Sequence, residues 1–210
     1  MSMLLQTEAL RYSYQKDHQL VFPDFGCQVN DQLLILGPSG SGKSTLLHLL
    51  ALILPIQEGK IFINQTDISQ LEGNKAAYFR AQHIGLIFQQ HHFVKSLSVM
   101  ENLEMTGYFG GGFDKSKARY LLESLGIAKY ENKPIFELSG GEKQRLGIAR
   151  ALLLKPKVIL ADEPTASLDD QNADYVYQLL TEKAKENNAA LLLVTHDNRL
   201  KSKVKNQIIL

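Results

Sequence analysis

A glycine-rich segment in the first quarter of the chain has the residue types that phosphate binding requires. It spans residues 37–45, reads GPSGSGKST and fits the pattern G-x-x-x-x-G-K-[ST]. Glycines let backbone N–H groups converge on phosphate oxygens, and the N-terminus of a following helix adds positive potential. In this pattern Lys43 reaches the β- and γ-phosphates, and the Ser44 hydroxyl is a ligand of Mg²⁺. The predicted phosphate-binding residues are Gly37, Pro38, Ser39, Gly40, Ser41, Gly42, Lys43, Ser44 and Thr45.

Two adjacent acidic residues, Asp162 and Glu163, follow the apolar run 158–161. Adjacent side chains on a strand point to opposite faces, so two acids at a strand end can serve different purposes. We expect Asp162 to belong to the Mg²⁺ shell, and Glu163 to orient or deprotonate the attacking water. An acid at such a turn is often only a helix N-cap, but the phosphate-binding loop in the same sheet favours the catalytic interpretation.

Short apolar runs bounded by polar or turn residues predict the strands that position these groups. Residues 33–36, 158–161 and 190–195 are apolar enough to be covered on both faces. Further strand candidates are 61–63 and 84–88, and helical patterns cover 43–51, 115–125, 141–154 and 174–186. Strands that alternate with helices predict a mostly parallel sheet.

The composition bounds the class of protein. Lys and Arg total 23 against 22 Asp and Glu, so the net charge of +1 gives no general drive toward nucleic acid, and no nucleic-acid partner is expected. One cysteine, Cys27, cannot form an internal disulfide and fits a reducing compartment. The longest nearly apolar stretch, 46–54, is far shorter than the roughly 20 residues that span a bilayer. The N-terminus lacks a secretory pattern, so we expect a cytoplasmic protein.

The segment 138–145, LSGGEKQR, resembles the signature motif of the ABC-type ATPases. Ser139 and the N–H groups of Gly140 and Gly141, at the start of a predicted helix, would again recognise phosphate, and Glu142 completes the motif. In that family the motif binds the γ-phosphate of an ATP held by the other subunit. The resemblance therefore implies a head-to-tail pair, either a homodimer or a pair with a homologous ABC subunit.

The remaining motifs of that family match in order. Gln89 looks like the glutamine that touches Mg²⁺ and the water, and His196 looks like the histidine that contacts the γ-phosphate. Residues 167–169, Ser-Leu-Asp, resemble the loop that crosses the dimer interface, which assigns Asp169 to that interface. Tyr14 and Tyr12 both lie upstream of the phosphate-binding loop and could stack on adenine. We favour Tyr14, although a tyrosine that only packs on the first sheet is equally compatible with the pattern.

The resemblance also implies the fold, an α/β P-loop NTPase with a mostly parallel core sheet and an N-terminal antiparallel β portion. One domain, 1–210, is expected. Within it, 1–90 and 139–210 would form the α/β core lobe, and 91–138, with three consecutive glycines at 110–112, would form a helical subdomain.

The functional reading that the resemblance favours is an ATP-hydrolysing subunit that powers a membrane transporter. The segments 88–90 and 97–103 are similar to those of the lipoprotein-release and macrolide-export branch, and amino-acid importers carry similar ones. An integral membrane permease would then hold the chain at the inner face of the membrane. The alternatives are a soluble ABC ATPase of DNA repair or chromosome organisation, an ABC complex that transmits force without transport, and a small P-loop kinase. Soluble ABC ATPases of the DNA-repair type carry a long coiled-coil insert, and the residues between Gln89 and Ser139 are too few to form one. A small P-loop kinase would not need the signature motif.

Overall fold

A parallel sheet of five strands forms the centre of the molecule, in a computed structural model that describes residues 3–15, 18–90, 92–166 and 168–210. The strand order is β10-β4-β9-β8-β7, and every neighbouring pair is parallel. The strands are β4 (Gln32–Leu36), β7 (Ile84–Ile87), β8 (Val158–Asp162), β9 (Ala190–Val194) and β10 (Asn206–Ile209). The predicted parallel sheet is confirmed, and β10 at its edge was not predicted.

Alternating side chains of these strands enter two separate cores, as the two-residue period of a strand requires. Leu34 and Leu36 of β4 pack with the helices on one face of the sheet. Leu33 and Ile35 pack on the other face, where α1 (Lys43–Leu50) lies. Because both faces are covered, strands of the parallel sheet read as continuous apolar runs in the sequence.

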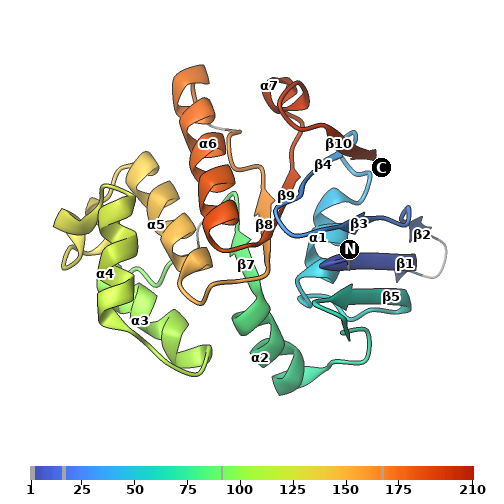
Figure 1. The fold of residues 1–210 in the computed structure, drawn as a ribbon, viewed down its shortest axis with the longest axis horizontal. Helices are drawn as coiled ribbons and strands as arrows, with labels where there is room; N and C mark the ends of the chain where they lie inside the picture. Colours follow the sequence, from blue (N-terminus) through green and yellow to red (C-terminus); the bar gives the residue numbers. More distant parts are fainter. Residues whose placement is uncertain (1–2, 16–17, 91, 167) are drawn as a thin grey trace.

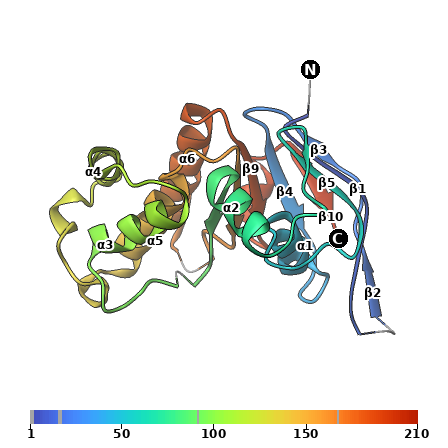
Figure 2. The ribbon, with the colours of Figure 1, turned by 90° about the horizontal axis from the view of Figure 1, so that it is seen from below.

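An antiparallel sheet covers the far side of α1. Its strands are β1 (Leu5–Gln15), β2 (His18–Val21), β3 (Gly26–Cys27), β5 (Glu58–Ile63) and β6 (Thr66–Asp67). β1 pairs with β2, β3 and β5, and β6 pairs with β5. The predicted strand 61–63 therefore belongs to this second sheet. Figures 1 and 2 show α1 lying between the two sheets, and the core that contains Leu46 and Leu49 joins them.

The other helices are α2 (Gly73–His83), α3 (Val99–Phe109), α4 (Lys115–Ser124), α5 (Gly140–Leu152), α6 (Asp170–Glu186) and the short α7 (Asn198–Lys201). α6 begins four residues before its predicted start, because the Asp169 side chain accepts a hydrogen bond from the Asn172 backbone N–H at 2.9 Å. The pattern of α2 was not recognised, since Ala76 is its one buried residue and the apolar period is correspondingly weak.

The segment between β7 and α5 is helical, with α3, α4 and the 3₁₀ turns Ala128–Tyr130 and Ile135–Glu137. Figure 1 shows α3, α4 and α5 together at the end of the molecule away from the antiparallel sheet. Buried Asn102 ties the chain that precedes α3 to that helix, because its amide donates to the carbonyls of Val94, Leu97 and Ser98 and accepts from the Val94 N–H.

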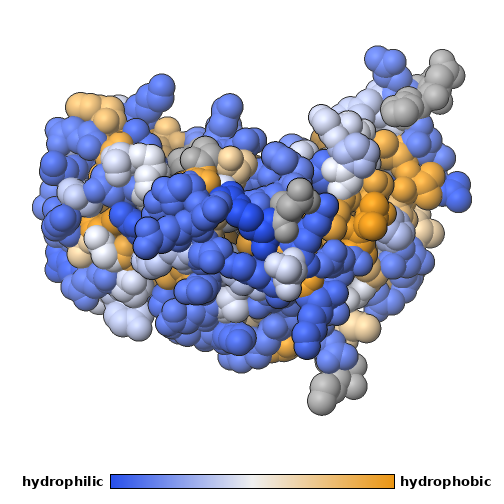
Figure 3. Space-filling view, turned by 90° about the horizontal axis from the view of Figure 1, so that it is seen from above, coloured by the Kyte–Doolittle hydropathy of each residue, from blue (hydrophilic) through white to orange (hydrophobic). Residues whose placement is uncertain are grey.

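Figure 3 shows a predominantly hydrophilic face across the centre of the molecule, with more hydrophobic surface toward the end that carries the antiparallel sheet. Within the residues that the structure describes, none of the helices has both the length and the apolar character that crossing a membrane requires.

Candidate active site

A cavity of about 760 Å³ opens at the carboxyl ends of the parallel strands. This edge of an open α/β sheet is where ligands bind in general, because the loops that follow the strands converge there. The residues that line it are Tyr14, Leu20, Gly37, Pro38, Ser39, Gly40, Gly42, Lys43, Ser44, Thr45, Gln89, Asp162, Glu163 and His196. Leu20 was missed in the sequence, since an apolar residue on a short strand carries no chemical signal.

The phosphate-binding loop connects β4 to α1 and approaches other parts of the chain closely. Gly42 has a φ of 95°, and a Cβ there would lie 3.2 Å from both Leu20 and Phe22, so the position requires glycine. The Lys43 ammonium donates to the carbonyls of Gly37 at 2.9 Å and Pro38 at 2.8 Å, which folds its side chain back over the loop. The Ser41 hydroxyl is buried and has no hydrogen-bond partner among the described residues. A buried, unpaired donor inside this loop fits a phosphate oxygen.

The two tyrosines have different surroundings. Tyr12 is buried, with 7% of its surface exposed, whereas Tyr14 is 59% exposed and lines the cavity. Their rings contact edge to face with centroids 4.9 Å apart, and the Tyr14 hydroxyl lies 3.0 Å from the Thr45 hydroxyl. Tyr14 therefore presents a ring beside the phosphate-binding loop, and Tyr12 supports it from the core.

Asp162 ends β8 and lines the cavity beside Lys43. Burial raises the pKa of its carboxyl, the neighbouring charge of Glu163 raises it further, and His48 and Lys43 oppose both effects. A cation close to Asp162 would relieve the cost of burying this charge.

Glu163 is fixed at the turn after β8. Its φ is 47° and its N–H donates to the Val194 carbonyl at 2.8 Å. The Thr195 hydroxyl donates to one carboxylate oxygen at 2.8 Å, and His196 Nδ1 lies 2.7 Å from the other. The Glu163 side chain is 12% exposed, while that of His196 is 73% exposed. The structure therefore brings two of the predicted catalytic residues, Glu163 and His196, into direct contact and leaves the imidazole open to the cavity.

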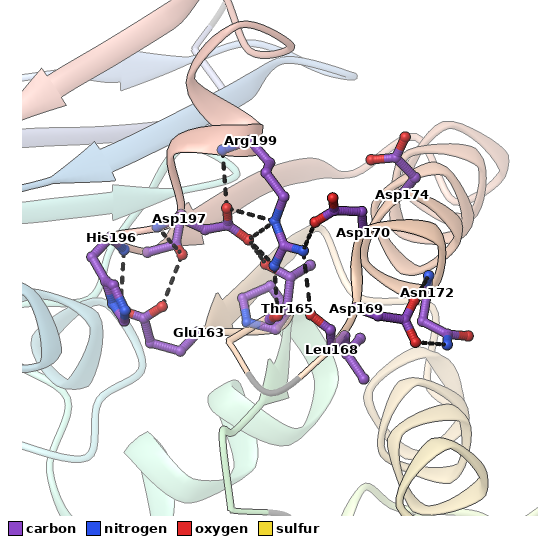
Figure 4. Close-up of polar contacts among 12 residues, drawn as sticks. Glu163, Thr165, Leu168, Asp169, Asp170, Asn172, Asp174, His196, Asp197 and Arg199 are labelled. Atoms are coloured by element: carbon purple, nitrogen blue, oxygen red, sulfur yellow. Dashed lines mark hydrogen bonds and ion pairs between the residues drawn. The ribbon is translucent and has the colours of Figure 1, made fainter.

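Thr165 and Leu168, which lie between Glu163 and α6, are held by a network of polar contacts around Arg199, shown in Figure 4. Arg199 forks onto the carboxylate of Asp197 with distances of 2.7–3.0 Å, and hydrogen bonds from Arg199 hold the pKa of Asp197 at about 2. Asp169 is the N-cap of α6, and hydrogen bonds from Asn172 lower the pKa of its carboxyl. Ser167, which the sequence placed in the same motif, lies outside the described residues.

Ser139, Gly140 and Gly141 of the signature motif are exposed, and the motif contributes no residue to the cavity. Ser139 caps α5, where its hydroxyl accepts from the Glu142 N–H at 3.3 Å and the Glu142 carboxylate accepts from the Ser139 N–H at 2.7 Å. Hydrogen bonds from Tyr130 and Ser139 lower the pKa of Glu142 to about 2. A Cβ at Gly140 or Gly141 would meet open space, so the helix N-terminus is accessible from outside.

The oxygen atoms of three cavity residues suit a magnesium ion. Ser44, Gln89 and Asp162 supply a hydroxyl, an amide and a carboxylate, which are the hard ligands that Mg²⁺ prefers. Within the described part of the chain, no three His, Cys, Asp or Glu residues form a group that could hold a metal. A Mg²⁺ site with few protein ligands is normal where phosphates supply the rest.

The fold and this site define a class of protein. The family model described as ABC transporter matches residues 23–166, which is more than half of the chain. The chain therefore belongs to the ABC transporter family, and it is an ATPase.

Individual relatives narrow the comparison. The chain is 38% identical to the lipoprotein-releasing system ATP-binding protein LolD of Shewanella oneidensis, over 98% of this chain and 93% of the relative. It is 36% identical to LolD of Ehrlichia ruminantium, over 97% of this chain and 92% of the relative.

Solved structures agree with this assignment. The ATP-binding cassette MJ0796, in a dimeric post-hydrolysis state bound to ADP and Pi, superimposes with a TM-score of 0.85 at 28% identity, over 98% of this chain and 94% of that one. The cbiO1 protein of Clostridium perfringens, part of the ABC transporter complex cbiONQ, gives a TM-score of 0.87 at 28% identity, over 100% and 85%.

Proposed function

We propose that the chain is the ATP-binding subunit of a lipoprotein-releasing type of transporter, and that two copies close head to tail around ATP. The single observation that carries the proposal is the division of the phosphate-recognising groups. The phosphate-binding loop, Asp162, Glu163 and His196 line one cavity, while the N-terminus of α5 lies exposed outside it. The phosphate site becomes complete when a second subunit brings the N-terminus of its α5 to the cavity. Similarity to LolD over nearly the full length supports the type of transporter.

The cavity residues divide the chemistry among them. Lys43 and the loop N–H groups bind the β- and γ-phosphates, and the Tyr14 ring stacks on adenine. Ser44, Gln89 and Asp162 would hold Mg²⁺, which would neutralise charge on the phosphates. Glu163 orients the attacking water and accepts a proton from it. His196, which contacts the Glu163 carboxylate from its exposed side, contacts the γ-phosphate.

The partner's α5 supplies the remaining phosphate contacts in this arrangement. Ser139, Gly140 and Gly141 present a hydroxyl and N–H groups at a helix N-terminus, where the helix dipole favours an anion. The capping box with Glu142 holds the Ser139 side chain in place before the partner arrives. Closure is favoured because ATP contacts both subunits in the closed state and one in the open state.

A groove beside Gln89 is the proposed contact with the membrane subunit. It has a volume of about 300 Å³ and lies between the helical segment and the core, with Phe88, His92, Thr106 and Arg150 in its wall. Because Phe88 directly precedes Gln89 in the chain, a segment of the membrane subunit bound in this groove is linked to the nucleotide site. The proposed location is the cytoplasmic face of the membrane, through an integral membrane permease.

Capture from detergent-solubilised native membranes tests the transporter assignment. Tagged Glu163→Gln protein with ATP and Mg²⁺ should retain a protein that has several membrane spans. Mass spectrometry identifies that protein, which should also have the large extracytoplasmic domain expected of a lipoprotein-release partner. Lys43→Ala protein is the matched control and should retain much less. Recovery of soluble or DNA-bound proteins alone would overturn the membrane role while leaving the ATPase intact.

A further inference from the structure

Arg199 uses its guanidinium to join two loops that are far apart in the sequence. Its Nε and Nη2 donate to Asp197 on its own loop, and Nη2 also donates to the Thr165 carbonyl at 3.3 Å. Its Nη1 donates to the Leu168 carbonyl at 3.2 Å and to Asp170 at 2.7 Å. The Arg199 side chain is 30% exposed, whereas Asp170 is 93% exposed, so the contacts with the two carbonyls and Asp197 lie deeper.

These contacts continue to the catalytic carboxylate. The Thr165 hydroxyl donates to Asp197 at 2.8 Å, and the Asp197 N–H donates to the Thr195 hydroxyl at 2.9 Å. That hydroxyl in turn donates to Glu163. Thr165 and Thr195 are fully buried, so loss of one partner would leave an unsatisfied polar group in the interior. Figure 4 shows the Arg199 side chain reaching from α7 between the His196 loop and the start of α6.

We propose that Arg199 is a positioning residue that locks Thr165, Leu168 and Asp170, which lie on either side of the predicted interface residue Asp169, to the loop that carries His196. The inference rests on the roles proposed above for Glu163 and His196 and on the interface position that the sequence predicts for Asp169. A shift of the subunit interface at Asp169 is then transmitted to the carboxylate and imidazole together. Arg199 does not line the cavity, so it acts on the reaction through these residues and not on ATP itself.

Arginine is required because the contacts point in different directions. The planar guanidinium presents five N–H donors in a fixed fork, and here they reach a carboxylate and two carbonyls. The ammonium of lysine keeps the charge but concentrates its donors at one point, so it cannot serve all of these acceptors at once. The Arg199→Lys variant therefore separates geometry from charge.

The test compares Arg199→Lys with Arg119→Lys in the full chain. Arg119 makes a bidentate pair with Glu131 at 2.9 Å in the helical segment, away from the cavity, and so controls for loss of such a pair in itself. Steady-state ATP hydrolysis, binding of a fluorescent ATP analogue and amide hydrogen exchange are measured for each. For Arg199→Lys we expect kcat to fall about tenfold with ATP affinity within about twofold of wild type. Exchange should rise in residues 164–170 and not across the chain. Arg119→Lys should match wild type in all three.

Each outcome decides the question. Wild-type kcat in Arg199→Lys overturns the proposal, and so does a loss of ATP affinity equal to the loss of kcat, which would indicate a general structural role. If exchange rises everywhere, Thr165→Val decides, because it leaves Arg199 in place and removes one donor to Asp197. The kcat of Thr165→Val should also fall, and a wild-type kcat in this variant refutes the inference.

Glu163→Gln is measured in parallel as a control on the proposed function. Hydrolysis that persists in Glu163→Gln shows that the proposed site roles have failed, not Arg199 alone.

Discussion

At the scale of single residues, neighbouring side chains hold Glu163 in place while its carboxylate still faces the cavity. Thr195 and the His196 imidazole fix the two carboxylate oxygens, and the carboxylate remains part of the cavity wall. The positive φ of Glu163 is uncommon for a residue with a side chain, and such strain is concentrated at functional sites. Sequence reasoning placed Glu163 and His196 correctly at strand ends. It could not identify Thr195 as the residue that supports Glu163, since a buried threonine at the end of an apolar strand is usual.

Replacing Glu163 with glutamine directly tests its proposed role as the base. The amide keeps the size and can still hydrogen-bond, but it cannot accept a proton from water at neutral pH. We expect kcat to fall by about a hundredfold or more, with ATP affinity kept within about threefold. Phosphate release and binding of a fluorescent ATP analogue measure the two quantities. Hydrolysis at the wild-type rate would remove Glu163 from the mechanism.

The pair of Asp197 and Arg199 has a defined pH dependence. The pKa of Asp197 is lowered from 3.8 to about 2, chiefly by hydrogen bonds from Arg199, so its charged form is favoured in the folded state. The pair therefore stabilises the fold fully above about pH 4, and this contribution is lost as the pH falls through about 2. We expect the difference in free energy of unfolding between wild type and Asp197→Asn to stay constant from pH 5 to 8 and to shrink below pH 4. Urea unfolding at each pH measures it, and a difference that grows on acidification would contradict the assignment.

At the scale of elements, burial made the parallel strands β4, β7, β8 and β9 predictable from the sequence, whereas the largely exposed edge strand β10 was missed. Local chemistry made α1, α5 and the phosphate-binding loop predictable. The antiparallel sheet was harder, because strands as short as β3 and β6 have too few residues to show a pattern. The Arg199 network could not be predicted, since its partners other than Asp197 lie 29 to 34 positions away in the sequence. No local period marks a contact of that kind.

Asn102 offers a test of how the segment after Gln89 is held. It is 1% exposed and makes hydrogen bonds with Val94, Leu97 and Ser98. Asn102→Ala leaves buried backbone groups without partners, so we expect the free energy of unfolding to fall by about 1–3 kcal/mol. Urea denaturation measures this, with the exposed Asn74→Ala on α2 as the control that should show no loss. Equal stability of both variants would show that the segment is held by other contacts.

At the scale of the whole molecule, the account depends on two incomplete halves of a phosphate site. The cavity at the ends of β4, β7, β8 and β9 contains the groups proposed to bind one ATP, and the N-terminus of α5 is directed elsewhere on the surface. The structural relative MJ0796 is dimeric with ADP and Pi bound. Two copies of this chain would complete each other's sites, so that nucleotide binding and subunit contact become a single event.

The most direct measurement is the mass of the Glu163→Gln protein by light scattering, with and without ATP and Mg²⁺. We expect a dimer with ATP and a monomer without it. Adding Ser139→Arg, which fills the start of α5, should abolish the dimer while binding of a fluorescent ATP analogue persists, because the cavity lacks Ser139. A protein that stays monomeric with bound ATP would contradict the head-to-tail arrangement. So would a dimer that still forms with ATP when Ser139→Arg is present.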